Sequence, residues 1–241
     1  MSPELQQQYL QAMGIQLWQS RHQSVAQPVE LSVPAVAEEP VITTEQVTLT
    51  PDQIPQDQAL SDWSLLESTV RSCVACELHQ SRSQTVIAEG SDSAALMIVS
   101  TAPALNAEFA SSLLSADSSL LLSNMLKAID IQRSDIYFTS LLKCQLPAGQ
   151  ALRTTAVLCC EPYLNQQIDM VKPDLIVALG EVTAQQLVVS KKTLPELRGK
   201  VYQYQSVPLM VMSHPDELLL KPETKRQAWH DLLQIKQKLS D

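Results

Sequence analysis

The sequence predicts an α/β domain whose parallel sheet is covered by helices on both faces, preceded by a disordered tail. From about residue 60 onward, short apolar runs typical of buried strands alternate with longer stretches of helical periodicity. Before that point, five prolines in under forty residues predict no packed element. With 241 residues and 45% hydrophobic content, the chain can fold one domain of ordinary size and still carry an extension.

The first segment, residues 1–21, predicts a short helix. Leu5, Tyr9, Leu10 and Met13 recur at helical spacing, and Gly14 is a suitable stop. Such a segment buries little surface by itself. It is either a frayed helix or a docking peptide that orders on a partner.

Residues 22–58 predict an extended acidic linker. They contain no Lys, Arg or Gly, and residues 1–70 hold a single basic residue, Arg21, against nine acidic ones. The tail therefore carries nearly all of the net charge of −9. The rest of the chain is close to neutral and shows no strong basic footprint for duplex DNA.

Residues 59–241 predict the globular domain, and its elements follow in order. A helix is expected at about 60–72, a strand at 95–99, helices around 105–114 and 118–129, and a strand at 135–139. A helix at about 151–171, a strand at 174–178 ended by Gly180, and a helix to about 189 come next. Strands at 201–205 and 208–212 and a closing helix at 224–239 complete the domain.

Composition excludes several classes of protein. Five glycines are about 2% of the chain against a usual ~7%, which argues against glycine-rich phosphate loops. The apolar runs are too short to span a bilayer. The first residues lack a basic-then-apolar signal pattern, so a cytoplasmic location without a membrane partner is expected.

Five cysteines form the strongest local signal. Cys73 and Cys76 have the C-x-x-C spacing of paired metal ligands, and Cys144 and Cys160 lie sixteen residues apart. Four thiolates from three segments would suit a tetrahedral zinc site or an iron–sulfur cluster, and the spacing does not separate the two. The simpler alternative is a set of buried small hydrophobic residues.

Several motifs resemble the iron–sulfur (family 4) uracil-DNA glycosylases. They occur in the family's order over about residues 71–240: CVACEL from Cys73, RSQTV from Arg82, IYFTSLLKC ending at Cys144, CEPYL from Cys160, KPDLIVALG ending at Gly180, LRGK, HP at His214, and KRQAW. The resemblance implies a three-layer α/β/α fold with a central four-stranded parallel sheet. It also implies a [4Fe–4S] cluster on Cys73, Cys76, Cys144 and Cys160, with Cys160 favoured over Cys159 and zinc as the lesser alternative.

The active-site motifs of that family are changed in this chain. Where the family has the loop Gly-Glu-Ala-Pro-Gly, this chain has Ser100-Thr-Ala-Pro-Ala104, so a carboxylate is replaced by Thr101. The base-stacking phenylalanine falls on Leu114, and the asparagine that reads the uracil edge falls on Ser140. A hydroxyl cannot make the paired contacts of an amide.

His214 is the only retained catalytic candidate. Glu108 and Asp216 are nearby carboxylates that could rescue some activity, although solvated surface carboxylates are the favoured interpretation for both. We therefore predict no measurable excision of uracil.

The N-terminal peptide resembles that of the psi subunit of the bacterial DNA polymerase III clamp loader. The match runs over LQAMGIQLW and Arg21. It implies docking on the clamp-loader ATPase subunits, and binding of the chi subunit, which contacts single-strand binding protein, by the globular domain. The anchors of the docking helix would be Tyr9, Leu10, Met13, Ile15 and Trp18.

These resemblances lead to one interpretation and two alternatives. The leading prediction is a non-catalytic, psi-like adaptor of the replicase on a degenerate glycosylase fold with a [4Fe–4S] cluster. The first alternative is an active, divergent family 4 uracil-DNA glycosylase in base excision repair. The second is a zinc- or cluster-binding protein of unrelated role.

Overall fold

A computed structural model describes residues 62–104 and 112–240. The expected docking helix, the whole of the linker and most of the expected 105–114 helix lie outside these residues. The described part is built on one sheet of six strands in the order β1-β3-β2-β4-β6-β5. The strands are β1 Ala88–Gly90, β2 Leu96–Ser100, β3 Ile136–Ser140, β4 Leu175–Leu179, β5 Tyr202–Tyr204 and β6 Val207–Met212.

The central four strands are parallel, as the sequence predicts. β3, β2, β4 and β6 run side by side, with Leu96 opposite both Ile136 and Leu175 and Ile176 opposite Leu209. β1 and β5 are antiparallel edge strands, so the sheet as a whole is mixed. β2, β3 and β4 are buried along their whole length, which explains why they read as unbroken apolar runs.

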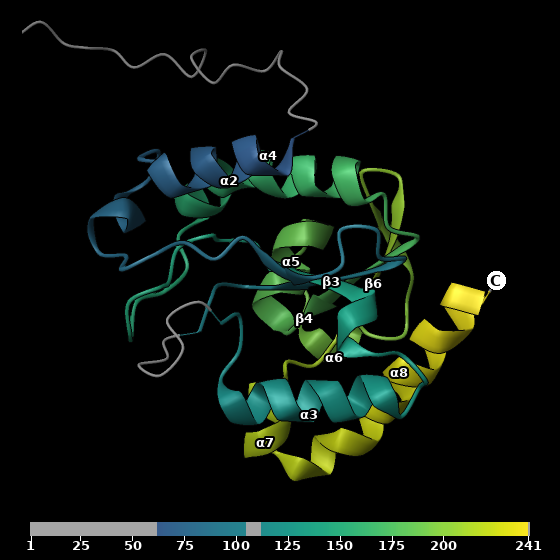
Figure 1. Cartoon of the computed structure of the whole chain (residues 1–241). Coiled ribbons are helices and arrows are strands. Elements are labelled where there is room, and N and C mark those ends of the chain that lie inside the picture. Colours follow the sequence, from purple (N-terminus) through teal and green to yellow (C-terminus); the bar gives the residue numbers. More distant parts are fainter. Residues whose placement is uncertain (1–61, 105–111, 241) are drawn as a thin grey trace, which may run out of the picture. The chain divides into compact units, whose positions relative to one another are not determined.

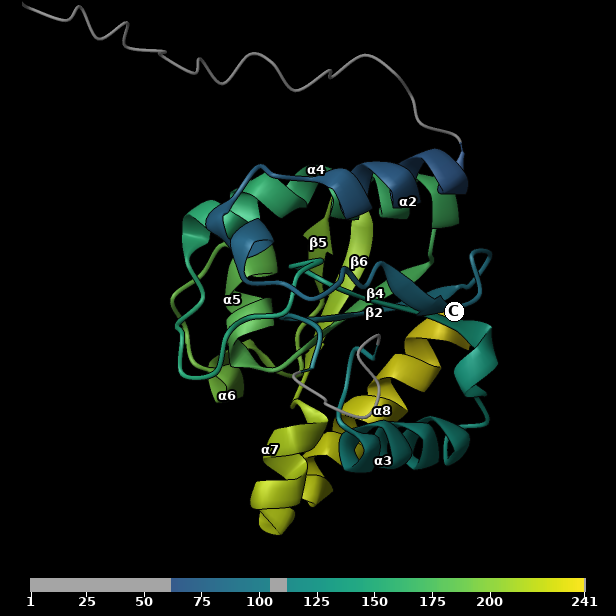
Figure 2. The same ribbon diagram turned by 60° about the vertical axis from the view of Figure 1, so that its left-hand side comes forward.

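Two helices cover one face of the sheet. α3 (Ala116–Lys127) and α8 (Lys225–Ser240) pack Leu122, Leu126 and Leu232 onto the face that carries Ile98 and Phe138. Figures 1 and 2 show these helices below the sheet, with α7 (Pro215–Leu220) beside them.

The opposite face is covered by α4 (Thr154–Val171), α5 (Glu181–Val188) and α6 (Leu194–Leu197), with α2 (Trp63–Ser72) running alongside α4 (Figure 1). Leu164, Ile168 and Ala184 pack there against Met97 and Val99 of β2. The arrangement has the three predicted layers. None of the helices within the two described ranges is both long and apolar enough to cross a membrane.

Three short elements were not predicted. β1 has only three residues, and α7 starts at a proline directly after His214. α6 is only four residues long, but its capping box of Thr193 and Glu196 is a signal that the sequence did contain. Of the expected helix at 105–114, residues 112–114 are described and are not helical.

Candidate active site at the carboxyl ends of the strands

A pocket of about 400 Å³ opens where three parallel strands end. Thr101–Ala104 follow β2, Gly180–Val182 follow β4, and His214 follows β6, and all of these residues line it. Leu113 and Leu114 supply an apolar wall. Open α/β sheets bind ligands at the carboxyl ends of their strands, which makes this pocket the candidate active site.

The described residues of the loop after β2, 101–104 and 112–114, carry no charged side chain. The hydroxyls of Thr101 and Thr183 share a hydrogen bond of 2.8 Å, which ties the loop to α5. The Thr101 carbonyl accepts from the Leu142 amide at 3.0 Å, and Gln145 Nε2 donates to the Ala104 carbonyl at 2.8 Å. The position that corresponds to the family's loop carboxylate is therefore a neutral hydroxyl held within the protein.

Gly180 makes room for the histidine on the next strand. Its φ of +83° is one that side chains rarely adopt. Its amide donates to the Met212 carbonyl at 2.8 Å, which links the ends of β4 and β6. This bond brings the backbone of Gly180 directly against the His214 side chain.

His214 is a largely buried ring at the start of α7. Its Nδ1 accepts from the Asp216 amide at 3.2 Å, so the neutral ring carries its proton on Nε2. Burial lowers the pKa of His214 below its usual 6.5, and the nearby Asp216 and Glu217 carboxylates oppose that change. At neutral pH the ring is therefore an uncharged hydrogen-bond donor that lines the pocket.

The structure separates the two other positions at which the family motifs are changed. Leu114 is buried in the pocket wall, where an apolar side chain can contact the face of a base. Ser140 is buried elsewhere, and its hydroxyl donates to the Leu142 carbonyl at 2.6 Å. Ser140 is not among the described residues that line this pocket.

Three carboxylates lie around the pocket. Glu181 accepts from the Leu194 amide at 2.7 Å and so caps α6. Glu217 is exposed, and Asp216 accepts a short hydrogen bond from the buried Ser118 hydroxyl of α3. Glu108 lies outside the described residues. The contact of Ser118 with Asp216 could not be predicted from the sequence, because the two residues are 98 positions apart and no local sequence pattern indicates the contact.

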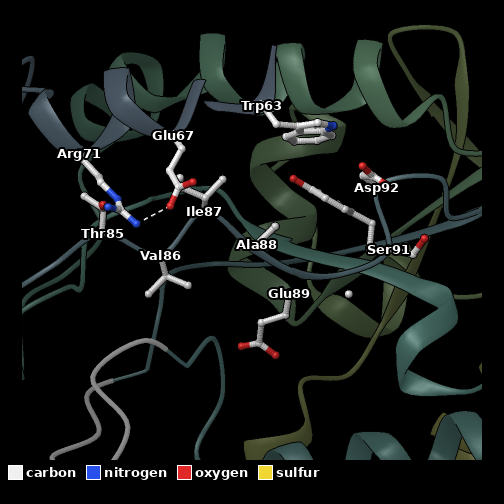
Figure 3. A pocket seen from close by; sticks show the side chains of 12 residues that line it. Trp63, Glu67, Arg71, Thr85, Val86, Ile87, Ala88, Glu89, Ser91 and Asp92 are labelled. Carbon is white, nitrogen blue, oxygen red and sulfur yellow. Dashed lines mark hydrogen bonds and ion pairs between the residues drawn. The ribbon is translucent and has the colours of Figure 1, made fainter. Parts of the chain in front are cut away.

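A larger cavity, of about 550 Å³, lies between α2 and β1 (Figure 3). Trp63 forms its roof and stacks at a tilt on Tyr137, 5.7 Å between ring centroids. Glu67 and Arg71 pair with one another along one side (Figure 3). Its lining runs along the β1 edge of the sheet, from Thr85, which bridges Cys144 after β3, to Asp92, so the cavity lies beside an edge strand and apart from the pocket formed by the ends of β2, β4 and β6.

The cysteines come together where the segment after β3 meets the loop after α2 and helix α4. Cys144 and Cys160 are buried in one apolar cluster with Leu78 and Leu142, and Cys76 packs against it. Burial raises the pKa of Tyr163, and the neighbouring Cys73 thiol adds to that rise, so Cys73 lies close to the helix that carries Cys160. None of the five is in a disulfide.

Cys159 and Cys160 are distinguished by their surroundings. Cys160 is 3% exposed and lies in the apolar cluster with Cys144. The Cys159 thiol instead donates to the Ala75 carbonyl at 3.2 Å. Burial raises the pKa of the Cys160 thiol to about 11, so a metal would have to displace its proton.

Two cations accompany the cysteines. Arg82 donates from one guanidinium nitrogen to Cys144 Sγ at 3.3 Å. Lys143 is fully buried, and its ammonium donates only to Thr139, Ser140 and Gln167, at 2.7–2.8 Å. Within the described part of the chain no carboxylate pairs with it. Burial lowers the pKa of Lys143 to about 7, so its amine is only partly protonated near neutral pH, and an anion bound at the cysteines would favour its charged form.

Comparisons with known proteins match the same region of the chain. Residues 87–233 match the family model described as the uracil DNA glycosylase superfamily. A protein of Pyrobaculum aerophilum named type-4 uracil-DNA glycosylase is 31% identical over 179 residues, covering 71% of this chain and 91% of that protein. The protein of the same name from Archaeoglobus fulgidus is 28% identical over 174 residues, covering 69% of this chain and 87% of its own.

These findings correct the leading functional prediction. Five relatives bear the name type-4 uracil-DNA glycosylase, which supports the glycosylase alternative, and the prediction of a non-catalytic replicase adaptor is wrong. That prediction gave decisive weight to a dozen N-terminal residues. They lie outside both the matched region and the described residues.

Proposed function

Since the chain belongs to the uracil-DNA glycosylase superfamily, among relatives of type 4, we propose that it hydrolyses the N-glycosidic bond of uracil in DNA. The observation that carries this proposal is the uncharged His214 ring beside the pocket at the strand ends. An enzyme that acts on a base in DNA must take the base out of the stack and hold it in such a pocket.

His214 supplies the electrostatic part of the reaction. When the bond between the sugar and the base breaks, negative charge develops on the leaving base. The Nε2–H of a neutral imidazole can donate a hydrogen bond to that charge, since Nδ1 is already used by the Asp216 amide. A preorganised donor of this kind contributes ~10²–10³ in rate.

The altered pocket sets the expected strength of the activity. Thr101 cannot supply the charge of a loop carboxylate, and Ser140 is turned away from the pocket. We therefore expect excision slower than that of relatives with an intact loop. The earlier prediction of no excision gives way to a proposal of slow excision.

Single-turnover excision from an oligonucleotide with one uracil, single- and double-stranded, tests the proposal. Wild type should release uracil, and His214→Asn should lower the rate by ~10² or more. His230→Asn is the matched control, because His230 is exposed on α8. No product from the wild-type protein, with its metal content verified, would contradict the proposal.

We further propose that Cys73, Cys76, Cys144 and Cys160 hold a [4Fe–4S] cluster. In the described residues no three metal-binding side chains are grouped closely enough to hold a single metal ion. A tetrahedral zinc needs all four sulfurs around one point, whereas a cluster distributes its thiolates over separate irons. The guanidinium of Arg82, which donates to Cys144 Sγ, supports an anionic group at this position.

In this proposal the cluster has a structural role and takes no part in the reaction at His214. It would join the loop after α2 to the segment after β3 and to α4, in addition to the small apolar cluster and the few hydrogen bonds that these segments share. Binding free energy of that kind adds to folding free energy.

A further inference from the structure

We propose that Asp216, held in place by Ser118, is the catalytic carboxylate that this chain uses in place of the loop carboxylate that Thr101 replaces. The inference rests on the proposed glycosylase function and names the group that activates water for it.

Among the described carboxylates that line the pocket, one in this role must be held in place by a contact and keep an oxygen free to meet water. Glu181 fails because it caps α6 through the Leu194 amide. Glu217 lines the pocket, but it is exposed and no hydrogen bond holds its carboxylate. Asp216 lines the pocket and its side chain is 56% exposed, so water can reach its carboxylate.

One hydrogen bond fixes the Asp216 carboxylate, and its other oxygen lies beside the histidine. Oδ1 accepts a hydrogen bond from the hydroxyl of Ser118, a residue that is wholly buried at the start of α3. Oδ2 lies 3.5 Å from His214 Nδ1. Since the neutral ring has no proton on Nδ1, it does not donate to Oδ2, and this oxygen keeps its basic lone pairs.

The backbone adds to this arrangement. The Asp216 amide donates to the His214 ring while its own side chain bonds to α3, so one residue sets both the tautomer of the donor and the place of the carboxylate. Ser118 is a positioning residue: it would touch neither the sugar nor the water, and it acts by orienting Asp216.

The step balances with water as the only co-reactant. The bond between C1′ and the base nitrogen breaks, and its electron pair goes to the base, which His214 stabilises. The water oxygen forms the new bond to C1′, and the proton that it loses passes to Asp216 Oδ2 and then to solvent. The base anion takes a proton from solvent after release. As an anion, Asp216 also stabilises the positive charge that develops on the sugar.

Four variants test this, with single-turnover rates at saturating protein and DNA affinity measured separately. Asp216→Asn should lower the rate by ~10² or more and leave affinity within about threefold, because an isosteric amide cannot accept the proton. Ser118→Ala should lower the rate ~10-fold with affinity unchanged, a split that simple destabilisation would not produce. Asp117→Asn is the matched control, because Asp117 is exposed on α3 next to Ser118 and is not among the residues that line the pocket, and its rate should stay within about threefold of wild type.

A rescue experiment separates replacement from mere proximity. Restoring a loop carboxylate as Thr101→Glu in the Asp216→Asn background should recover at least ~10-fold of the lost rate. An unchanged rate in Asp216→Asn, while His214→Asn is impaired, would overturn this inference and leave the glycosylase proposal standing. Absence of excision by the wild type would overturn both.

Discussion

Gly180 and His214 meet so closely that a Cβ added at Gly180 would lie 3.2 Å from the Cβ of His214. Their backbones are joined through the bond between the Gly180 amide and the Met212 carbonyl, two residues before the histidine. One of only five glycines in the chain is therefore placed where the ends of two parallel strands converge on the pocket. The positive φ of Gly180 and this close approach make glycine necessary here for two separate reasons.

Gly180→Ala should therefore damage both stability and excision. The left-handed conformation costs an alanine ~1–2 kcal/mol, and the new methyl group must push the His214 side chain away. Gly149→Ala is a matched control: its φ is +75°, yet nothing lies within 4 Å of the added Cβ. Thermal unfolding should show a loss in both variants, whereas single-turnover excision should fall at least ~10-fold only in Gly180→Ala. Equal rates in the two variants would show that the contact with His214 has no catalytic consequence.

The buried histidine predicts a particular dependence on pH. Because burial lowers the pKa of His214, the unfolded chain takes up a proton near pH 6.5 that the folded protein does not take up until lower pH. The free energy of unfolding should therefore decrease as pH falls below about 6.5, down to the pKa of the folded state. Excision should persist below pH 6.5 for the same reason, since the ring stays neutral.

Chemical denaturation of wild type and His214→Asn across this range provides the measurement. The variant should lose the part of the pH dependence that belongs to His214, whereas His230→Asn should retain it. An excision rate that halves at pH 6.5 or above would contradict a lowered pKa for this histidine.

Most of the fold could be predicted from its apolar runs. β2 and β4 are central strands buried on both faces, so the sequence marks them with five unbroken apolar or small residues. The edge strand β1 could not be predicted in this way, because it has three residues and ends in a glycine. Its place is set by pairing with β3, about fifty residues later, which is tertiary information.

The candidate site was predictable only where it lies next to a strand end. His214 and Thr101 follow β6 and β2 closely, so motif order and strand order both located them. Ser140 also follows this pattern, yet its hydroxyl turns to the backbone of Leu142, which the sequence does not reveal. The bond from Ser118 to Asp216 depends on how α3 packs against α7, and no spacing along the chain encodes it.

The two adjacent cysteines predict opposite results when each is replaced. Cys160→Ala should abolish bound iron and sulfide and lower the unfolding temperature, because Cys160 lies in the apolar cluster with Cys144. Cys159→Ala should keep both, because its thiol donates to the Ala75 carbonyl. Iron and sulfide analysis after anaerobic purification decides. A colourless wild-type protein with one equivalent of zinc, or iron loss in Cys159→Ala alone, would contradict the assignment.

We predict that the charge of Arg82 changes the reduction potential of the proposed cluster without changing cluster assembly. Its guanidinium donates to Cys144 Sγ at 3.3 Å and to the Arg71 carbonyl at 2.8 Å, so a positive charge is fixed beside one of the proposed ligands. A positive charge stabilises the more negative, reduced state of a cluster and so raises its reduction potential. Arg82→Gln keeps a donor near the sulfur and removes the charge.

The reduction potential of Arg82→Gln should therefore be lower than that of wild type by roughly 40–60 mV, since about 59 mV corresponds to ~1.4 kcal/mol for one electron. Arg71→Gln serves as the control, because the Arg71 side chain is 69% exposed and pairs with Glu67 on the surface of α2. A redox titration followed by electron paramagnetic resonance measures both variants at equal iron content. Of these two arginines, Arg82 is the one that contacts Cys144. Equal shifts of the potential in the two variants would therefore show that the effect comes from the overall surface charge and not from this contact.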